Sequence, residues 1–165
     1  MGHVKMAEML IKKGSCVNLK DRHFQTPLHY SARKDLLRLV ILLLNAQCDI
    51  NAADLNGDRA LHIAASKGLY EMVKVLVTHS GVDINAPNLR GLTPLHTAVE
   101  SGFSSVVELL LTANCDPSCE SKCLLTPLDV AGDEFVRRWH PEIFTMIRNA
   151  LDQRKQNWDV GETSL

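Results

Sequence analysis

The sequence predicts an all-α solenoid of stacked helix-turn-helix units, on two observations. The first is a four-residue motif that recurs along the 165-residue chain as Thr-Pro-Leu-His, Arg-Ala-Leu-His, Thr-Pro-Leu-His and Thr-Pro-Leu-Asp. The leucines of the four copies are Leu28, Leu61, Leu95 and Leu128, so successive units are 33, 34 and 33 residues apart. The second is a helical spacing of apolar residues between the copies. A repeat of this length with this spacing indicates an elongated stack of small helical units.

Each copy of the motif predicts the start of a first helix. Threonine suits the N-cap position and proline suits the first helical turn. Three residues after the leucine, every unit has a small residue that would let a second helix approach closely: Ser31, Ala64, Ala98 and Ala131. Gly68 and Gly102 stand where this helix must end, because glycine accepts the left-handed conformation that follows a helix.

A second helix is predicted in each unit from adjacent apolar pairs that recur four residues apart. These pairs are Leu39-Val40 and Leu43-Leu44, Met72-Val73 and Leu76-Val77, and Val106-Val107 and Leu110-Leu111. Apolar residues at intervals of three and four lie on one face of a helix. Each unit therefore contains two short helices that bury one face each.

A unit of about 33 residues with Thr-Pro-Leu-His, Gly, Val-x-x-Leu-Leu and Asp-Ile-Asn resembles the ankyrin repeat. The resemblance covers residues 1 to 151 and implies an ankyrin-repeat solenoid whose helix pairs are joined by short β-hairpin fingers. It divides the chain into the second half of a repeat (1–18), three full repeats (19–51, 52–85 and 86–118), a degenerate C-terminal capping repeat (119–151) and a polar flexible tail (152–165).

Two ends of the array depart from the regular unit. Gly2-His3 aligns with the start of the family's second helix, so the chain opens halfway through a repeat, and we expect a fragment or a shortened isoform. At the other end, about three extra residues around Trp139-His140-Pro141 lengthen the last unit.

Composition excludes several classes of function. The formal net charge is -1 and aromatic residues make up 5%, which disfavours direct binding to nucleic acid. The longest apolar run, around Leu36–Leu44, is too short for a membrane span and is broken by Arg38. Five cysteines, an odd number, indicate reduced thiols, so we expect a cytoplasmic location, with the nucleus as a second compartment.

No pattern for catalysis, metal binding or a cofactor stands out, so we expect no enzyme activity. His29, His62 and His96 share one repeat position, where the resemblance implies a histidine that hydrogen-bonds near the Thr-Pro turn and joins neighbouring units. The spacing of Cys115, Cys119 and Cys123 lacks the Cys-x-x-Cys pair and the fourth ligand of a zinc site. A metal-dependent catalyst would need zinc in the purified protein.

The expected partner-binding surface is the concave face, which ankyrin-like stacks form from exposed positions of their first helices and from their finger tips. The helix positions are Tyr30, Arg33, Lys34, Ile63, Lys67, Thr97, Glu100, Asp133 and Glu134, and the finger positions are Arg22, His23, Phe24, Leu55, Asn56, Leu89 and Arg90. Along this face the charge is predicted to run from basic to acidic beside an apolar strip of Tyr30, Ile63 and Val130. The alternative is that these positions are merely solvated helix faces.

Two fingers have unusual residues at the turn position that Gly57 and Gly91 occupy elsewhere. Phe24 and Leu124 replace the glycine, and bulky residues tolerate a positive φ poorly. We therefore expect either that these fingers are remodelled or that the two side chains pack on a neighbour.

The function predicted is that of a non-catalytic protein-protein interaction module. The alternatives are an IκB-like inhibitor of a transcription factor and an ankyrin arm of a larger signalling, channel or ubiquitin-ligase adaptor protein. The last four residues, with Thr163 and Leu165 at the defining positions, also resemble a PDZ-domain ligand.

Overall fold

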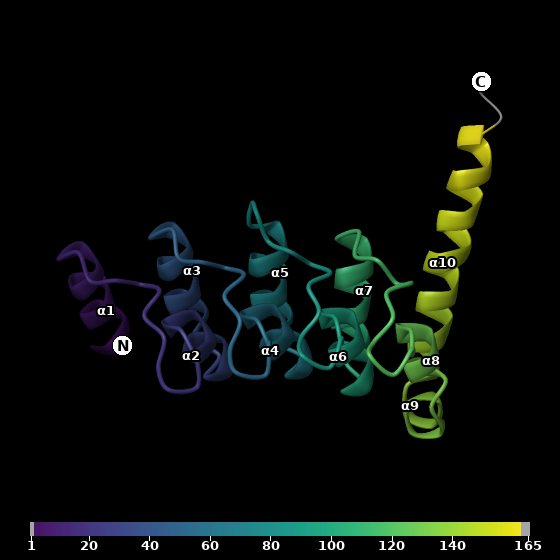
Figure 1. The fold of residues 1–165 in the computed structure, drawn as a ribbon, viewed down its shortest axis with the longest axis horizontal. Coiled ribbons are helices and arrows are strands. Elements are labelled where there is room, and N and C mark those ends of the chain that lie inside the picture. Colours follow the sequence, from purple (N-terminus) through teal and green to yellow (C-terminus); the bar gives the residue numbers. More distant parts are fainter. Residues whose placement is uncertain (1, 163–165) are drawn as a thin grey trace.

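A computed structural model describes residues 2–162, and the side chains of residues 4–156, as a row of helix pairs (Figure 1). The first helices of the repeats, called inner helices below, are α2 (Pro27–Arg33), α4 (Ala60–Ser66), α6 (Pro94–Glu100) and α8 (Pro127–Ala131). The second, outer helices are α1 (Gly2–Lys12), α3 (Leu37–Asn45), α5 (Tyr70–Thr78), α7 (Ser104–Thr112) and α10 (Pro141–Glu162). A further short helix, α9 (Glu134–Trp139), lies between α8 and α10. The predicted all-helical repeat architecture is confirmed.

The connections between helix pairs contain tight turns rather than assigned strands. Within residues 2–162 no residue is assigned to a strand, so the expected β-hairpin character of the fingers is not confirmed. Each finger is a five-residue turn closed by a backbone hydrogen bond, such as the one that Asp54 N–H donates to Asp58 O at 2.9 Å. The four turns, called fingers from here on, span residues 21–25, 54–58, 88–92 and 121–125.

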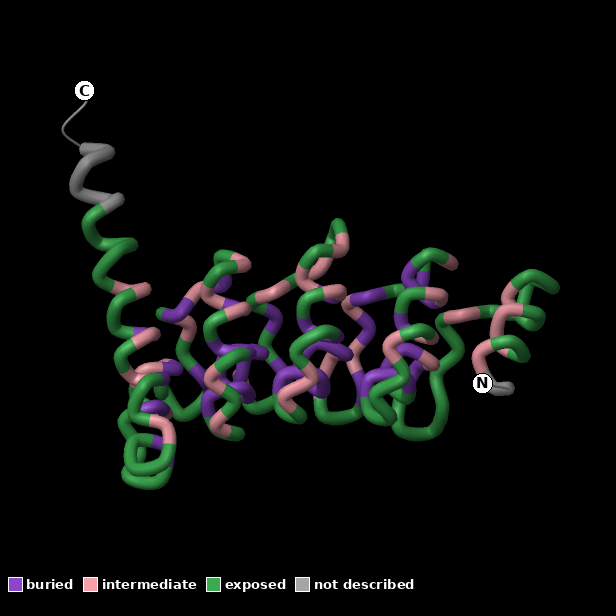
Figure 2. Tube along the Cα trace, turned by 180° about the vertical axis from the view of Figure 1, so that it is seen from behind, coloured by how far each residue is buried: buried purple, intermediate pink, exposed green. Residues whose placement is uncertain are grey.

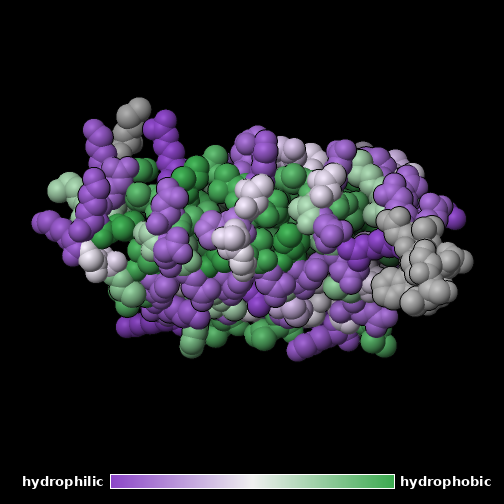
Figure 3. All heavy atoms as spheres, turned by 90° about the horizontal axis from the view of Figure 1, so that it is seen from above, coloured by the Kyte–Doolittle hydropathy of each residue, from purple (hydrophilic) through white to green (hydrophobic). Residues whose placement is uncertain are grey.

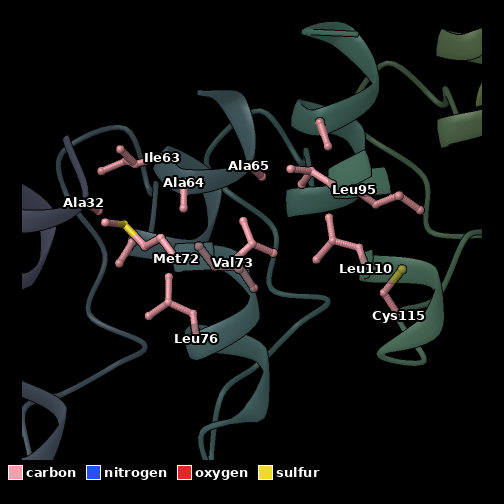
Figure 4. Packing of buried hydrophobic residues seen from close by; sticks show 14 of the residues in the cluster. Ala32, Ile63, Ala64, Ala65, Met72, Val73, Leu76, Leu95, Leu110 and Cys115 are labelled. Atoms are coloured by element: carbon pink, nitrogen blue, oxygen red, sulfur yellow. The ribbon is translucent and has the colours of Figure 1, made fainter. Parts of the chain in front are cut away.

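The core lies where inner and outer helices meet, as the buried segments of Figure 2 show. In the three full repeats the motif leucines Leu28, Leu61 and Leu95 are buried together with Val40, Val73 and Val107 of the outer helices, whereas Leu128 of the last unit is half-buried. Figure 4 shows part of this packing, with Ala64, Met72, Val73 and Leu95 among its labelled residues. Ala64 and Ala98 are completely buried, which confirms that small side chains let the helices approach. Viewed from above, hydrophobic residues form a band along the long axis between hydrophilic margins (Figure 3), as expected for a core that continues from unit to unit.

Glycine ends two of the inner helices, as predicted. Gly68 and Gly102 have φ of 68° and 74°, in the left-handed region. Glycine is also needed there for space, because a Cβ on Gly68 would lie 2.4 Å from the ring of Phe103, and one on Gly102 would lie 2.5 Å from the ring of His140. Phe103 and His140, which precede α7 and α10, therefore pack directly on the turn of the preceding unit.

The last unit keeps this packing but contains an inserted helix. The residues that precede the outer helices are Leu36, Leu69, Phe103 and His140, so the spacing is 33, 34 and then 37 residues. Helix α9 accounts for the extra length, and α10 then takes the outer position against α7 and α8.

Helix α10 continues through residues 152–162, where the sequence predicts a polar flexible tail. No proline follows Pro141 in this segment and the first glycine is Gly161, so nothing in the sequence ends the helix earlier. Arg154 also attaches this part of α10 to the end of α7, since its guanidinium donates to Asp116 Oδ1 at 2.8 Å and to Cys115 O at 2.8 Å.

Neighbouring repeats are joined by histidines at the repeated motif position. In His62, Nδ1 accepts a hydrogen bond from the backbone N–H of Arg59 at 3.2 Å, and Nε2 lies 3.0 Å from Leu92 O in the next finger. His29 and His96 repeat the arrangement, with Nε2 at 3.0 Å from Asp58 O and from Leu125 O. Because Nδ1 accepts from a backbone donor, Nε2 must carry the proton and donate to the next repeat.

A second set of bonds joins the repeats at the end of the outer helices. Asn18 Oδ1 accepts from Asp49 N–H at 2.8 Å, Asn51 Oδ1 from Asp83 N–H at 2.9 Å, and Asn85 Oδ1 from Asp116 N–H at 2.7 Å. The next position of this series is Ser118, not asparagine. At this last boundary the connection to α10 is made by Arg154, which donates to Asp116 Oδ1. Every described repeat boundary from α1 to α7 thus has hydrogen bonds that fix the offset between units.

We predict that His62→Ala lowers the free energy of unfolding by about 2 to 3 kcal/mol, because two hydrogen bonds are lost and the buried Leu92 carbonyl is left without its donor. Urea unfolding followed by circular dichroism measures the change. The matched control is His23→Ala, an exposed finger histidine, for which we expect less than about 0.5 kcal/mol. Equal effects of the two substitutions would contradict the role assigned to His62.

We also predict that stability falls on mild acidification. Burial lowers the pKa of His29, His62 and His96 from the ordinary 6.5. Between the lowered pKa and 6.5, the unfolded chain binds more protons than the folded chain does. The contribution of the neutral histidines to the free energy of unfolding is therefore complete above pH 6.5 and is lost as the pH falls below that value. Urea unfolding at a series from about pH 7.5 to about pH 5.5 should show the decrease, and His62→Asn should make it smaller. A flat profile would refute the prediction.

Candidate protein-binding surface

A hollow of about 240 Å³ lies over the inner helices of three consecutive repeats. Seven of the residues predicted to bind a partner line it together: Arg33, Asn56, Ile63, Lys67, Arg90, Thr97 and Glu100. They come from α2, α4, α6 and two fingers, and Asp58, His62, Ser66 and Ser101 complete the lining. The repeat register alone predicted that these separated residues would share one face, and the structure brings them together.

The floor of this hollow corrects the expected exposure of two positions. Ile63 and Thr97 were predicted to be exposed, yet they are 7% and 6% exposed. The prediction was wrong because neighbouring inner helices stand close enough to cover both side chains. The apolar strip of Tyr30, Ile63 and Val130 is consequently interrupted at Ile63, with Tyr30 exposed and Val130 half-buried on either side.

Charges around the hollow form one ion pair between neighbouring repeats and one within a repeat. Arg33 lies 3.8 Å from the carboxylate of Asp54, and Arg90 lies 3.9 Å from that of Glu100. Lys67 is exposed and has no ion pair among the residues with described side chains. The rim of the hollow therefore carries both signs of charge in close alternation.

The expected acidic end of the face lies elsewhere. Asp133 and Glu134 were aligned with the end of an inner helix, but α8 ends at Ala131. Asp133 instead caps α9, with its carboxylate accepting from Phe135 N–H at 2.9 Å, and Glu134 is the first residue of that helix. Along the inner helices the predicted run from basic to acidic charge stops at Glu100, because the inserted helix displaces the last two residues.

The fingers form a continuous hydrogen-bonded edge beside the hollow. Leu55 N–H donates to His23 O at 3.0 Å, Leu89 N–H to Asn56 O at 2.9 Å, and Lys122 N–H to Arg90 O at 3.0 Å. Within each finger the first side chain closes the turn, as where Asp54 Oδ1 accepts from Asn56 N–H and Asp58 N–H. The tips expose an apolar row along this edge, which consists of Phe24, Leu55, Leu89 and Leu124.

Both expectations for Phe24 and Leu124 are wrong. Each residue adopts φ of 59° in a turn with the same backbone hydrogen bonds as the other fingers, and each side chain is exposed. The Lys20 ammonium lies 5.7 Å from the Phe24 ring centre. Gly57 differs because a Cβ there would lie 2.6 Å from Leu89 N in the next finger.

The other predicted finger and helix residues are accessible but lie outside the hollow. Arg22, His23 and Lys34 are exposed. The hydroxyl of Tyr30 donates to Asp21 Oδ2 at 2.8 Å, which holds its ring beside the first finger. The predicted PDZ ligand, Thr163 and Leu165, lies outside the described residues.

A larger hollow, about 840 Å³, lies between α1 and α3 and is lined by apolar residues such as Leu36, Leu37 and Ile41. It involves none of the concave-face or finger positions that the repeat register predicts for a partner. The smaller hollow is the candidate surface, because three repeats and two fingers converge there.

In the part of the chain that the structure describes, no three His, Cys, Asp or Glu side chains gather as a metal ion would require. Burial raises the pKa of the Cys48 thiol to about 11 and that of the Cys115 thiol to about 12, which disfavours the reactive thiolate. In the described residues, no helix combines the length and the apolar character needed to cross a bilayer.

We predict that iodoacetamide labels the exposed Cys16 and Cys123 in the native protein and spares Cys48 and Cys115, because burial both blocks access and suppresses thiolate formation. Peptide mass spectrometry at mildly alkaline pH locates the label. Denatured protein serves as the control, in which all five cysteines should react. Native labelling of Cys115 as fast as Cys123 would contradict the packing at the end of α7.

Comparisons with known proteins agree with this architecture. A model of ankyrin repeats (3 copies) matches residues 36–121. The putative ankyrin repeat protein FPV244 of Fowlpox virus is 36% identical over 72 residues, which cover 44% of this chain and 11% of that protein. The probable E3 ubiquitin-protein ligase XBOS33 of Oryza sativa subsp. japonica is 37% identical over 77 residues, which cover 46% of this chain and 15% of the ligase.

The NF-kappa-B inhibitor alpha of Gallus gallus is 36% identical over 63 residues, which cover 38% of this chain and 20% of the inhibitor. In each case the similarity spans a fifth or less of the relative's length. Ankyrin repeats are protein-interaction repeats whose stacks use extended concave surfaces. With half of its length matched by the family model and the helix pairs stacked in the same register, the chain belongs to the ankyrin repeat family.

Proposed function

We propose that the chain is a non-catalytic protein-binding module that holds a partner protein in the hollow over α2, α4 and α6 and against the finger tips. The observation that supports this most directly is that three consecutive repeats and two fingers contribute to one concavity. The concave shape suits a protruding side chain of a partner. His62, the residue of the lining whose pKa is lowered by burial, already has both ring nitrogens hydrogen-bonded within the stack.

The hydrogen bonds between repeats favour binding because they fix the surface beforehand. The fingers are joined through His23 O, Asn56 O and Arg90 O, and the histidines join each inner helix to the next finger. A partner would therefore not need to order the backbone on binding, which lowers the entropic cost.

The rim offers polar contacts that a partner could exchange. Arg33, Arg90 and Glu100 have exposed side chains in long ion pairs, at 3.8 Å from Arg33 to the buried Asp54 and at 3.9 Å between Arg90 and Glu100, and exposed pairs contribute little to stability. Their charged groups could instead form shorter bonds to a partner. Lys67, between them and without an ion pair among the described side chains, would select a carboxylate or a carbonyl oxygen.

The relatives suggest contexts for this module without choosing between them. An inhibitor and a ubiquitin-protein ligase both contain the same repeats. We therefore propose two contexts, an IκB-like inhibitor of a transcription factor and the ankyrin arm of a larger signalling, channel or ubiquitin-ligase adaptor protein. The five free cysteines support a location in the cytoplasm or nucleus, and the C-terminal Thr163 and Leu165 would serve a PDZ-domain protein.

A charge reversal in the hollow tests the proposal. The intact chain should retain a set of proteins from a cell lysate, and the Lys67→Glu variant should retain less of each of them. The reason is that the substitution reverses the charge of a residue that lines the hollow. Quantitative mass spectrometry of the retained proteins measures the loss.

The matched control is Lys74→Glu, the same change on the exposed side of the outer helix α5. It should leave retention unchanged. If the two variants lose the same proteins to the same extent, or if the intact chain retains nothing above a bead control, the hollow is not the binding surface.

A further inference from the structure

Helix α9 is an insertion that the stacking of the repeats does not require. In the two preceding units the chain passes from the inner to the outer helix through Gly68-Leu69 and Gly102-Phe103. In the last unit, the ring of His140 packs on Gly102 as Phe103 packs on Gly68 one unit earlier. The six residues of α9 lie between the inner helix α8 and His140.

The side chains of α9 face solvent to an unusual degree for their type. Only Val136 is buried, at 5% exposed, while Phe135 and Trp139 are 66% and 64% exposed. Figure 2 shows this helix exposed over most of its length at the C-terminal end of the stack. Phe135 and Trp139 are four residues apart, so they share one face of the helix and form a single aromatic patch. Adjacent exposed aromatic side chains typically mark a contact site.

The charges beside this aromatic patch are basic. Arg137 and Arg138 lie in the last turn of α9, and neither has an ion pair among the described side chains. The Arg138 guanidinium lies 5.9 Å from the Trp139 ring centre, which leaves its N–H groups free at the edge of the patch. A hollow of about 410 Å³, lined by Gly132, Glu134 and the two arginines, adjoins the patch.

Two acidic residues lie at the start of α9, and one of them, Glu134, lines the same hollow as both arginines. The carboxylate of Asp133 is bound to the Phe135 N–H as the N-cap of α9. Glu134 lies at the opposite end of α9 from Trp139 and lines the hollow. A ligand that covers the Phe135–Trp139 face therefore meets arginine at one end and carboxylates at the other.

We propose that α9 is a second docking surface, which takes an acidic segment of a partner protein. An aromatic or aliphatic side chain of that segment would cover Phe135 and Trp139, and a carboxylate beside it would bind Arg138. Arg137 lies on another face of α9, with its guanidinium 5.7 Å from the Phe144 ring centre. Tryptophan and arginine are the residues most often found at the energetic centre of protein interfaces, and arginine binds carboxylates through paired hydrogen bonds.

Peptide selection on the full chain tests this proposal. A displayed library of random peptides of about 16 residues is selected for binding to the intact chain. Peptides that also bind a Phe135→Ala/Trp139→Ala double variant are removed. This variant should keep the fold, because both side chains are exposed. We expect enriched peptides to contain more Asp and Glu than Lys and Arg, together with large apolar residues. Their synthetic versions should bind roughly tenfold more weakly to Arg138→Glu. Binding should also weaken as salt rises from about 50 to about 300 mM.

The matched control is a Phe24→Ala/Leu89→Ala double variant, which removes exposed apolar side chains from the fingers instead. It should bind the selected peptides as the intact chain does. Thermal unfolding verifies that all variants are folded. Because Lys67 is not involved, loss of hollow binding and loss of α9 binding are separate results.

Several outcomes would overturn the proposal. They are an absence of enriched peptides, enrichment without an acidic excess, and peptides whose binding survives Trp139→Ala. Two alternative ligands are tested in the same way: single-stranded RNA of about 12 nucleotides, and vesicles with about 30 mol% phosphatidylserine. If the peptides do not bind but one of these ligands does, and its binding is lost with Trp139→Ala, the patch is assigned to nucleic acid or membrane instead. Self-association in sedimentation that disappears with Trp139→Ala would assign it to a second copy of this chain.

Discussion

The hydrogen bond between a motif histidine and the finger of the next repeat is the interaction on which the rest of this structure depends. His62 fixes its own Arg59 turn through Nδ1 and reaches Leu92 O through Nε2, so one side chain sets both the start of an inner helix and the position of its neighbour. An ankyrin unit cannot bury its helices alone, and stability comes from the interfaces between units. The asparagine bonds at the outer-helix ends, such as Asn51 to Asp83 N–H, repeat the same connection on the other side of the core.

This regularity is also what creates a surface for a partner. Because each finger bonds to the next, residues about thirty positions apart in sequence, such as Asn56 and Arg90, stand side by side on one rigid edge. The short distance between neighbouring inner helices also buries Ile63 and Thr97. These two residues, which were expected to contact a partner, instead form the floor of the hollow. Affinity on such a surface depends on the few groups that stay accessible at its rim, among which Lys67 is central.

The places where the chain departs from the repeat are the most specific to it. Phe24 and Leu124 keep the finger turn at a positive φ that glycine usually occupies, which leaves a large apolar side chain at each tip. Helix α9 interrupts the last unit and exposes two aromatic residues, while His140 preserves the packing on Gly102. The stacking of the repeats does not require these features. We therefore regard Phe24, Leu124 and the aromatic residues of α9 as the ones that would distinguish the partner binding of this chain from that of other ankyrin repeats.

The number of full repeats, the two helices in each and the glycine stops at Gly68 and Gly102 follow from the sequence alone, because they depend on a local period that repeats. The linking role of the three histidines was implied by the resemblance to the ankyrin repeat, and the structure shows these bonds. The same register wrongly placed Asp133 and Glu134 on an inner helix and residues 152–162 in a flexible tail, since a repeat register cannot foresee an insertion or a contact such as Arg154 with Asp116. Tertiary packing decides which residues of a predicted face are accessible and which ion pairs form at its rim. Burial depends on the distance between neighbouring units, and that distance is set by packing across repeats rather than by any residue's own position in the chain.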